Sequence, residues 1–243
     1  MIFVHLYNDS SGSPRVLSSV IASLSESRDD HVLFLGSAGD GLLGKLALPI
    51  VRYFYPRYSN KWAVLLAYLV SQLCLFVCLL FSSKTRGQDK VYINTVLPFG
   101  AALYGKLTGK RVIYHIHEAS LSPPILFNVL MWLADHLADQ QIYVSKTQQQ
   151  QVGSSHPNQK VLYNSVSESI YQVAQQINQP RKETFTVFMP ASLRSFKGID
   201  VFVQLPEYFS DKSIKWVLLL NESPASVAEY RAKYEHITQL SVL

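Results

Sequence analysis

The chain has 243 residues, 48% of them apolar and 16% charged, which is enough to bury the core of one large domain or two small ones. Its formal net charge is +5, and residues 40–118 carry ten Lys and Arg against three Asp and Glu, a local excess of +7. This basic, apolar region favours an anionic membrane surface or a phosphate-bearing substrate. A nucleic-acid partner is disfavoured because no recognition-helix, zinc or aromatic-platform pattern accompanies the charge.

Short apolar runs alternate with longer helical segments, a pattern typical of βαβ units and a parallel sheet. Strands are expected at residues 2–7, 31–35, 90–94, 111–117, 141–144 and 160–163, and helices at 14–24, 61–81, 98–107, 123–137 and 146–152. After a polar linker at 172–180 the pattern restarts, with strands at 184–189 and 215–220 and helices at 199–209 and 223–234. The sequence therefore predicts an α/β chain of two Rossmann-like domains, residues 1–178 and 179–243, the second with only about two βα repeats.

The run at residues 62–81 has twenty residues without a charge and basic residues on both sides, so by length and hydropathy it qualifies as a membrane span. The strands before and after it are expected to belong to one sheet, which a span would separate. We therefore expect a crossover helix that leans on the membrane interface, with a single span at 62–81 as the less favoured alternative. The start Met1–Leu6 lacks the basic residues of a secretory signal, which favours a cytoplasmic location.

The loop after the first strand contains Gly12 and Ser13 and leads into a helix. Its backbone amides could approach a phosphate or an acceptor, and Ser13 before Pro14 fits an ordinary helix cap equally well. The glycines of residues 36–41 follow the second strand with the spacing G-x-x-G-x-G, which does not meet the dinucleotide fingerprint. A flexible loop is the better interpretation, and an NAD-dependent enzyme is disfavoured.

Polar residues end several predicted strands. Asn94 and Thr95 either hydrogen-bond a sugar or acceptor hydroxyl or cap the next helix. His117 and Glu118 lie where open α/β sheets bind ligands, and a neutral histidine there can polarise a sugar or accept a proton. A solvated strand-end pair is the alternative.

Three further predictions concern neighbouring strand ends. His115 is expected to point to the opposite face from His117 and to be structural, which leaves no metal-ligand set. Ser145 is expected to cap the helix at 146–152, and Asn164 to form a tight turn that lines the cleft.

The loop after residues 184–189 places Arg194 and Lys197 three positions apart. A fixed Arg-Lys pair would neutralise the charge that develops on a leaving diphosphate without a metal ion, although two solvated cations would give the same pattern. Gly198 is expected to permit close approach of the loop and to begin the next helix.

Five segments resemble the retaining glycosyltransferases of family four: the loop at Gly12 and residues 91–95, 113–118, 161–166 and 192–199. The resemblance implies the GT-B fold of two facing Rossmann-like domains. It also implies that Arg194 and Lys197 contact the diphosphate of a nucleotide sugar, that His117 approaches the transferred sugar, and that the first domain holds the acceptor. The donor is a substrate, and no cofactor or metal is implied.

The sequence departs from this family at three places. Ser13 follows Gly12 instead of a second glycine, Asn164–Ser165 replaces Asn-Gly, and the carboxylate pair of the donor site would follow residue 243. We therefore expect a truncated or split hexosyltransferase that acts with retention on a polysaccharide or lipid-linked oligosaccharide acceptor. It would lie at the cytoplasmic face of the inner membrane. The alternative is a non-catalytic acceptor-binding or membrane-anchoring subunit.

Overall fold

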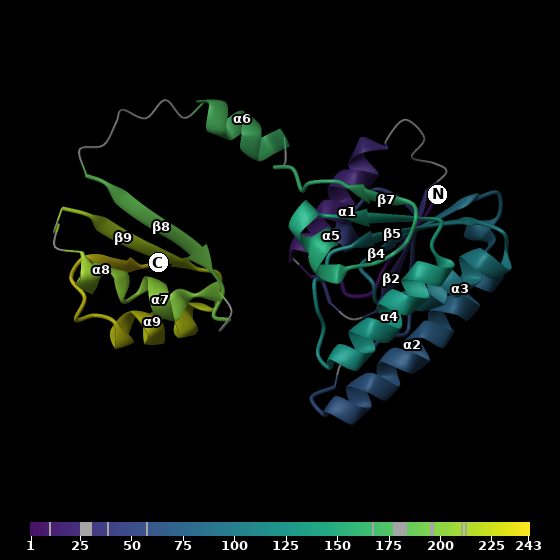
Figure 1. The fold of residues 1–243 in the computed structure, drawn as a ribbon, viewed down its shortest axis with the longest axis horizontal. Coiled ribbons are helices and arrows are strands. Elements are labelled where there is room, and N and C mark those ends of the chain that lie inside the picture. Colours follow the sequence, from purple (N-terminus) through teal and green to yellow (C-terminus); the bar gives the residue numbers. More distant parts are fainter. Residues whose placement is uncertain are drawn as a thin grey trace. The chain divides into compact units, whose positions relative to one another are not determined.

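The computed structural model describes residues 1–9, 11–24, 31–37, 39–56, 58–166, 168–176, 184–194, 197–209, 211 and 213–243. The chain divides into two compact units, Met1–Ile170 and Tyr171–Leu243 (Figure 1). The predicted boundary at residues 178 and 179 falls outside the described residues. The predicted polar linker at 172–180 is helical at its start, because α6 covers Glu168–Gln176.

Unit 1 is built on a sheet of seven parallel strands in the order β3–β2–β1–β4–β5–β6–β7. The strands are β1 (Ile2–His5), β2 (Val32–Gly36), β3 (Ile50–Tyr53), β4 (Lys90–Asn94), β5 (Arg111–Ile116), β6 (Gln140–Tyr143) and β7 (Gln159–Val161). The strand order reverses between β1 and β4, which creates a crevice at their carboxyl ends. The sequence missed β3, an edge strand of four residues of which only Tyr53 is buried.

Helices cover both faces of this sheet, as a doubly wound fold requires. On one face α1 (Gly12–Ser23) packs Leu17 and Ile21 against alternate residues of β1, β2, β4 and β5. On the other face lie α2 (Lys61–Phe81), α3 (Phe99–Leu107) and α4 (Pro124–Leu137) (Figure 1). The short α5 (Lys146–Val152) follows β6, and the Ser145 hydroxyl accepts from the Gln148 amide at 3.1 Å, which confirms the predicted cap.

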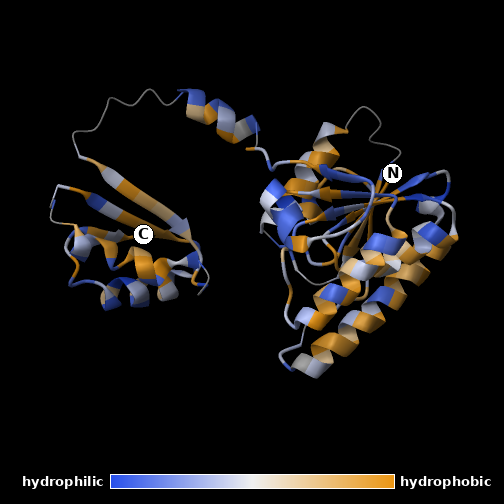
Figure 2. Ribbon diagram, viewed as in Figure 1, coloured by the Kyte–Doolittle hydropathy of each residue, from blue (hydrophilic) through white to orange (hydrophobic). Residues whose placement is uncertain are grey.

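Helix α2 runs from β3 to β4, two strands of the same sheet. It packs closely on α3, where a side chain at Gly100 would come within 2.3 Å of the Gln72 carbonyl oxygen. Residues 62–81 of α2 are long and apolar enough to cross a membrane, and 33% of this stretch is buried. Its outer face carries exposed apolar side chains spaced three and four apart, and the helix is largely hydrophobic in Figure 2. We call Trp62, Leu66, Leu69, Leu73, Val77 and Leu80 the outer stripe of α2.

Unit 2 has a parallel sheet of three strands, β8 (Thr186–Ala191), β9 (Lys215–Leu220) and β10 (Leu240–Val242), in the order β10–β9–β8. Helices α7 (Ile199–Phe202), α8 (Leu205–Tyr208) and α9 (Pro224–Lys233) accompany it, and Trp216 and Leu218 lie in its core. The single helix predicted at 199–209 is wrong. Proline has no amide to donate and crowds the preceding turn, so the chain restarts as α8 with Pro206 in its first turn.

Candidate functional site

The carboxyl ends of β1, β4 and β5 bring together three polar side chains that are far apart in the sequence. Asn94 is the centre of this cluster: its Nδ2 donates to the Ser13 carbonyl oxygen and to His5 Nδ1, both at 3.1 Å. Its Oδ1 lies 2.9 Å from Nε2 of His117. A carbonyl oxygen only accepts, so Ser13 fixes the orientation of the amide. Oδ1 must then accept a hydrogen bond from His117, whose Nε2 therefore carries a hydrogen.

The histidines of this cluster are neutral at pH 7. Burial lowers the pKa of His5 to about 4 and that of His115 to about 4. Burial, followed by the neighbouring His115 and His5, lowers the pKa of His117 to about 3. Because Nε2–H of His117 is donated to Asn94, the lone pair of its Nδ1 is the remaining hydrogen-bonding group of the ring, and it suits the hydroxyl of a ligand.

His115 and His117 share one face of the chain, so the expectation that they point to opposite faces is wrong. Residues two apart in a strand lie on the same side, and the two ring centroids are 4.4 Å apart. The Tyr92 hydroxyl bonds to Nδ1 of His115 at 2.7 Å, and His115 is fully buried. Among the residues that the structure describes, no group of three or more His, Cys, Asp or Glu is arranged to hold a metal ion.

The Glu118 carboxylate hydrogen-bonds to the backbone of neighbouring residues. Its Oε2 accepts from the amides of Val96 at 3.1 Å and His117 at 3.2 Å. Burial raises the pKa of the Glu118 carboxyl, and the hydrogen bonds from these amides lower it by less. Nε2 of Gln148 donates to the carbonyl oxygens of Ile116 and Glu118, both at 3.0 Å. This geometry gives Glu118 a positioning role for the His117 backbone and for the loop after β4.

Neither Asn94 nor Thr95 caps a helix, because α3 begins at Phe99 and its N-cap is Pro98. Thr95 has a φ of 79°, the left-handed conformation that strains a β-branched residue, and its amide donates to the His115 carbonyl oxygen at 2.8 Å. Its buried hydroxyl has no hydrogen-bond partner among the described residues. Ser13 does not cap α1 either, because it is the second residue of that helix.

The two glycine-containing loops differ in kind. A side chain at Gly12 would meet nothing within 4 Å, so open space lies beside the loop after β1. Side chains at Gly36, Gly39 and Gly41 would come within 2.0, 2.1 and 2.4 Å of backbone oxygens of the segment after β1. Close backbone packing therefore requires glycine at these three positions, and Gly39 in addition has a φ of 89°.

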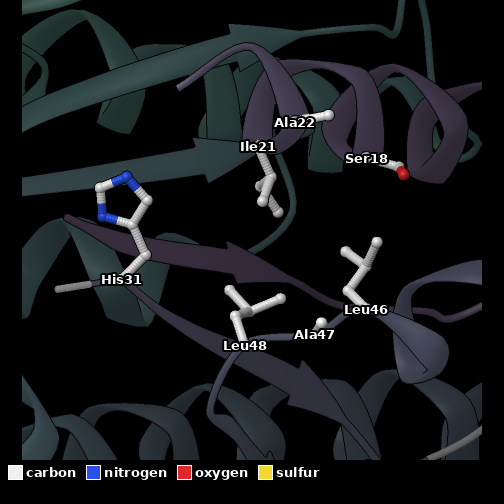
Figure 3. Close-up of a pocket in the computed structure, with 7 residues that line it drawn as sticks. All are labelled: Ser18, Ile21, Ala22, His31, Leu46, Ala47 and Leu48. Atoms are coloured by element: carbon white, nitrogen blue, oxygen red, sulfur yellow. The ribbon is translucent and has the colours of Figure 1, made fainter. Parts of the chain in front are cut away.

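Asn164 takes no part in the hydrogen bonds that join His5, Asn94 and His117. It is exposed and lines a separate groove of about 400 Å³ with Arg15 and Ser19 of α1. A further pocket of about 100 Å³ lies near the amino ends of the strands, where Ile21 of α1 faces Leu46 and Leu48 (Figure 3). That volume is far below the several hundred Å³ of ligand sites.

In unit 2 the loop after β8 exposes Arg194 and Lys197. The Lys197 amide donates to the Arg194 carbonyl oxygen at 2.9 Å, which brings the backbones of these two residues together. The intervening residues 195 and 196 lie outside the described residues. Gly198 has a φ of 72° and precedes α7, and a side chain there would meet nothing within 4 Å. The backbone conformation rather than close approach therefore requires glycine.

Sequence reasoning missed Glu222, which follows β9. Its Oε1 accepts from the Leu193 amide at 2.8 Å and so holds the loop that carries Arg194. A carboxylate two residues beyond the predicted strand end at Leu220 was the available signal.

No protein-family model matches the chain, and no curated protein matches it. Solved structures do match. HepE from Anabaena, determined with UDP and glucose, gives a TM-score of 0.65 at 17% identity over 100% of this chain and 68% of that one. Sucrose-phosphate synthase from Thermosynechococcus elongatus gives a TM-score of 0.66 at 9% identity, over 100% of this chain and 69% of that one. A protein of Listeria monocytogenes described as a UDP-N-acetylglucosamine 2-epimerase gives a TM-score of 0.57 at 10% identity, over 99% of this chain and 68% of that one.

HepE and sucrose-phosphate synthase are GT-B glycosyltransferases. At these identities the similarity establishes architecture and not activity. The chain therefore has the GT-B type of fold, a Rossmann-like unit with a seven-stranded parallel sheet followed by a second parallel α/β unit.

Proposed function

We propose that this chain carries the acceptor side and part of the donor side of a glycosyltransferase. It would move a hexose, with retention and without an essential metal, from a nucleotide diphosphate sugar to a saccharide or lipid-linked acceptor. The observation that carries this proposal is the hydrogen-bonded cluster of His5, Asn94 and His117 at the switch point of the seven-stranded sheet. The binding of UDP and glucose by HepE, a structural relative, supports the donor class.

His117 would orient the sugar as an uncharged hydrogen-bonding group. With its Nε2–H committed to Asn94, the ring offers the lone pair of Nδ1 to a sugar hydroxyl. Its lowered pKa keeps it neutral throughout the physiological range, so it would not repel a cationic, oxocarbenium-like sugar. Glu118 would keep the ring in place by bonding the His117 amide.

Arg194 and Lys197 would bind the diphosphate of the donor and stabilise it as the glycosidic bond breaks. A hydrogen bond between charged groups contributes about 1.5–3 kcal/mol, so losing either side chain should weaken binding by about 10- to 150-fold. Both residues lie beyond the carboxyl end of β8, the edge at which open α/β sheets bind ligands.

We also propose that unit 1 rests on the cytoplasmic face of a membrane through the outer stripe of α2. The exposed fractions of its side chains reach 79% at Trp62, 65% at Leu66 and 64% at Leu73. Large exposed apolar patches on a folded surface mark interaction sites, and the basic charge of residues 40–118 favours an anionic lipid surface.

The test is calorimetric titration of UDP into the full chain and into Arg194→Ala and Lys197→Ala variants. Lys215→Ala is the matched control, because Lys215 is an exposed lysine of unit 2 at the amino end of β9. We expect each loop variant to bind UDP at least tenfold more weakly and the control to bind normally. Absence of UDP binding by the unmodified chain, or equal affinity in all variants, would contradict the proposal.

A further inference from the structure

The edge at which the strands of the seven-stranded sheet begin carries a concentration of positive charge. Residues 82–111, which run from the end of α2 to the start of β5, contain six Lys and Arg and a single Asp. Lys90 and Arg111 are the first residues of β4 and β5 and pair with each other in the sheet, so the segments that enter these strands lie side by side. We call the six cations the edge cluster: Lys84, Arg86, Lys90, Lys106, Lys110 and Arg111.

Helices α2 and α3 both end at this edge and leave large apolar side chains exposed there. Each helix leads into a strand of the parallel sheet, so its carboxyl end lies where that strand begins. The helices are in contact, since a side chain at Gly100 of α3 would come within 2.3 Å of the Gln72 carbonyl oxygen of α2. Phe81 at the end of α2 is 79% exposed, and Leu107 at the end of α3 is 75% exposed. The outer stripe of α2 therefore leads to an apolar end that borders the edge cluster.

The turn between α2 and β4 holds two of these cations on a fixed backbone. Thr85 is buried, and its hydroxyl donates to the Leu79 carbonyl oxygen at 3.1 Å. The Thr85 carbonyl oxygen in turn accepts from Nζ of Lys110 at 3.4 Å, which ties the turn to the segment before β5. Lys84 and Arg86, on either side of this buried threonine, are exposed. Little backbone ordering is therefore needed when these two side chains bind an anion.

The charge of the edge cluster is only partly neutralised within the chain. Two ion pairs join it to carboxylates: Lys90 with Asp89 at 3.7 Å, and Lys106 with Asp139 at 2.8 Å. In the part of the chain that the structure describes, no carboxylate pairs with Lys84 or Arg86. Unit 1 thus presents unneutralised cations next to two exposed apolar side chains.

We propose that the edge cluster binds the phosphate groups of anionic phospholipids, with Phe81 and Leu107 inserted among the headgroups. This deepens the membrane contact proposed above for the outer stripe of α2 and rests on it. Cations beside exposed apolar side chains are what an anionic membrane interface binds. A soluble polyanion such as a nucleic acid would meet the same cations but leave Phe81 and Leu107 in water, so the observations favour the membrane.

The test is co-sedimentation of the full chain with phosphatidylcholine vesicles, either alone or with phosphatidylglycerol as about one third of the lipid. A Lys or Arg near such an anionic surface contributes about fivefold in affinity. The double variant Lys84→Gln with Arg86→Gln should therefore bind the anionic vesicles about 25-fold more weakly, with binding to neutral vesicles unchanged.

The matched control is the double variant Lys45→Gln with Lys146→Gln. It removes the same charge from two exposed lysines that follow the carboxyl ends of β2 and β6, at the opposite edge of the sheet. The five residues of β4 span about 17 Å between the edges, which exceeds the Debye length of about 8–10 Å. The control should therefore change binding by less than about twofold.

The apolar part of the contact is tested separately. Phe81→Ser should weaken binding to anionic vesicles about tenfold, because a large apolar side chain no longer leaves water. Leu162→Ser is its control, since Leu162 is 48% exposed and follows β7, away from the ends of α2 and α3. Circular dichroism checks that each variant folds.

Equal binding of anionic vesicles by the two double variants would overturn the inference, as would equal affinity of the unmodified chain for the two kinds of vesicle. Normal binding by Phe81→Ser would overturn it too and would indicate a soluble polyanion as the partner. If Leu73→Ser in the outer stripe weakens vesicle binding while Lys84→Gln with Arg86→Gln does not, the edge cluster is excluded and the contact proposed for the outer stripe stands. Absence of binding to any vesicle would contradict both, whereas the UDP titration decides glycosyl transfer independently.

Discussion

Replacing Asn94 by aspartate tests whether this amide organises the site. The side chain keeps its shape but loses Nδ2, which donates to the Ser13 carbonyl oxygen and to His5 Nδ1 at 3.1 Å. Two buried donations become contacts between acceptors, each costing about 1–1.5 kcal/mol, so unfolding of unit 1 should become easier by about 2–3 kcal/mol at pH 8. The third bond, from His117, remains possible.

The same substitution should change how stability depends on pH. A buried carboxylate beside His5 and His117 favours the imidazolium form and raises the pKa of these histidines by about 1–3 units. As pH falls to 5.5 the variant gains an ion pair that the unmodified chain lacks. Since one pKa unit corresponds to about 1.4 kcal/mol, the destabilisation should be smaller at pH 5.5 than at pH 8, by up to about 2 kcal/mol if the pKa of His5 rises by the full 3 units.

The assay is hydrogen exchange of peptides covering β4 and β5, followed through a urea titration at pH 8 and pH 5.5. It reports on unit 1 alone, even if the two units unfold separately. Asn128→Asp on the exposed face of α4 is the control, with an expected change within about 0.5 kcal/mol. Equal effects of the two substitutions at pH 8, or a loss for Asn94→Asp that does not depend on pH, would refute the reasoning.

Two further predictions follow from the same structure. The pKa values of His5 and His115 in the folded chain, about 4, lie below the unfolded value, so the unfolded chain binds more protons between pH 6.5 and 4. The free energy of unfolding should therefore be highest above about pH 6.5 and should fall by about 2 kcal/mol per histidine at pH 5. Urea midpoints that stay constant from pH 8 to pH 5 would contradict this. Gly198→Ala should destabilise unit 2 by about 1–2 kcal/mol because the residue has a φ of 72°, whereas Gly12→Ala, with open space around it, should change little. Equal thermal shifts for the two glycine variants would show that the turn before α7 tolerates a side chain.

Much of the fold could be read from local patterns in the sequence. The bounds of β4, β9, α2 and α5 agree with the predicted ones, because strand and helix periodicity are properties of a few neighbouring residues. The place of His117 and Glu118 at a strand end follows from the same local pattern. β3 was missed because four residues, only one of them buried, carry too weak a signal. The helix at 199–209 was misjudged because the effect of Pro206 was overlooked.

The organisation of the site required the tertiary structure. Asn94 bonds to a histidine 89 positions away and to another 23 positions away, and only the pairing of β1 and β5 with β4 makes these contacts. The close packing of Gly36, Gly39 and Gly41 on the segment after β1 depends on the same strand order. The sequence by itself determined which elements form and which polar groups end the strands. The order and register of the sheet decided which of those groups meet, because hydrogen bonds act over about 3 Å regardless of separation along the chain.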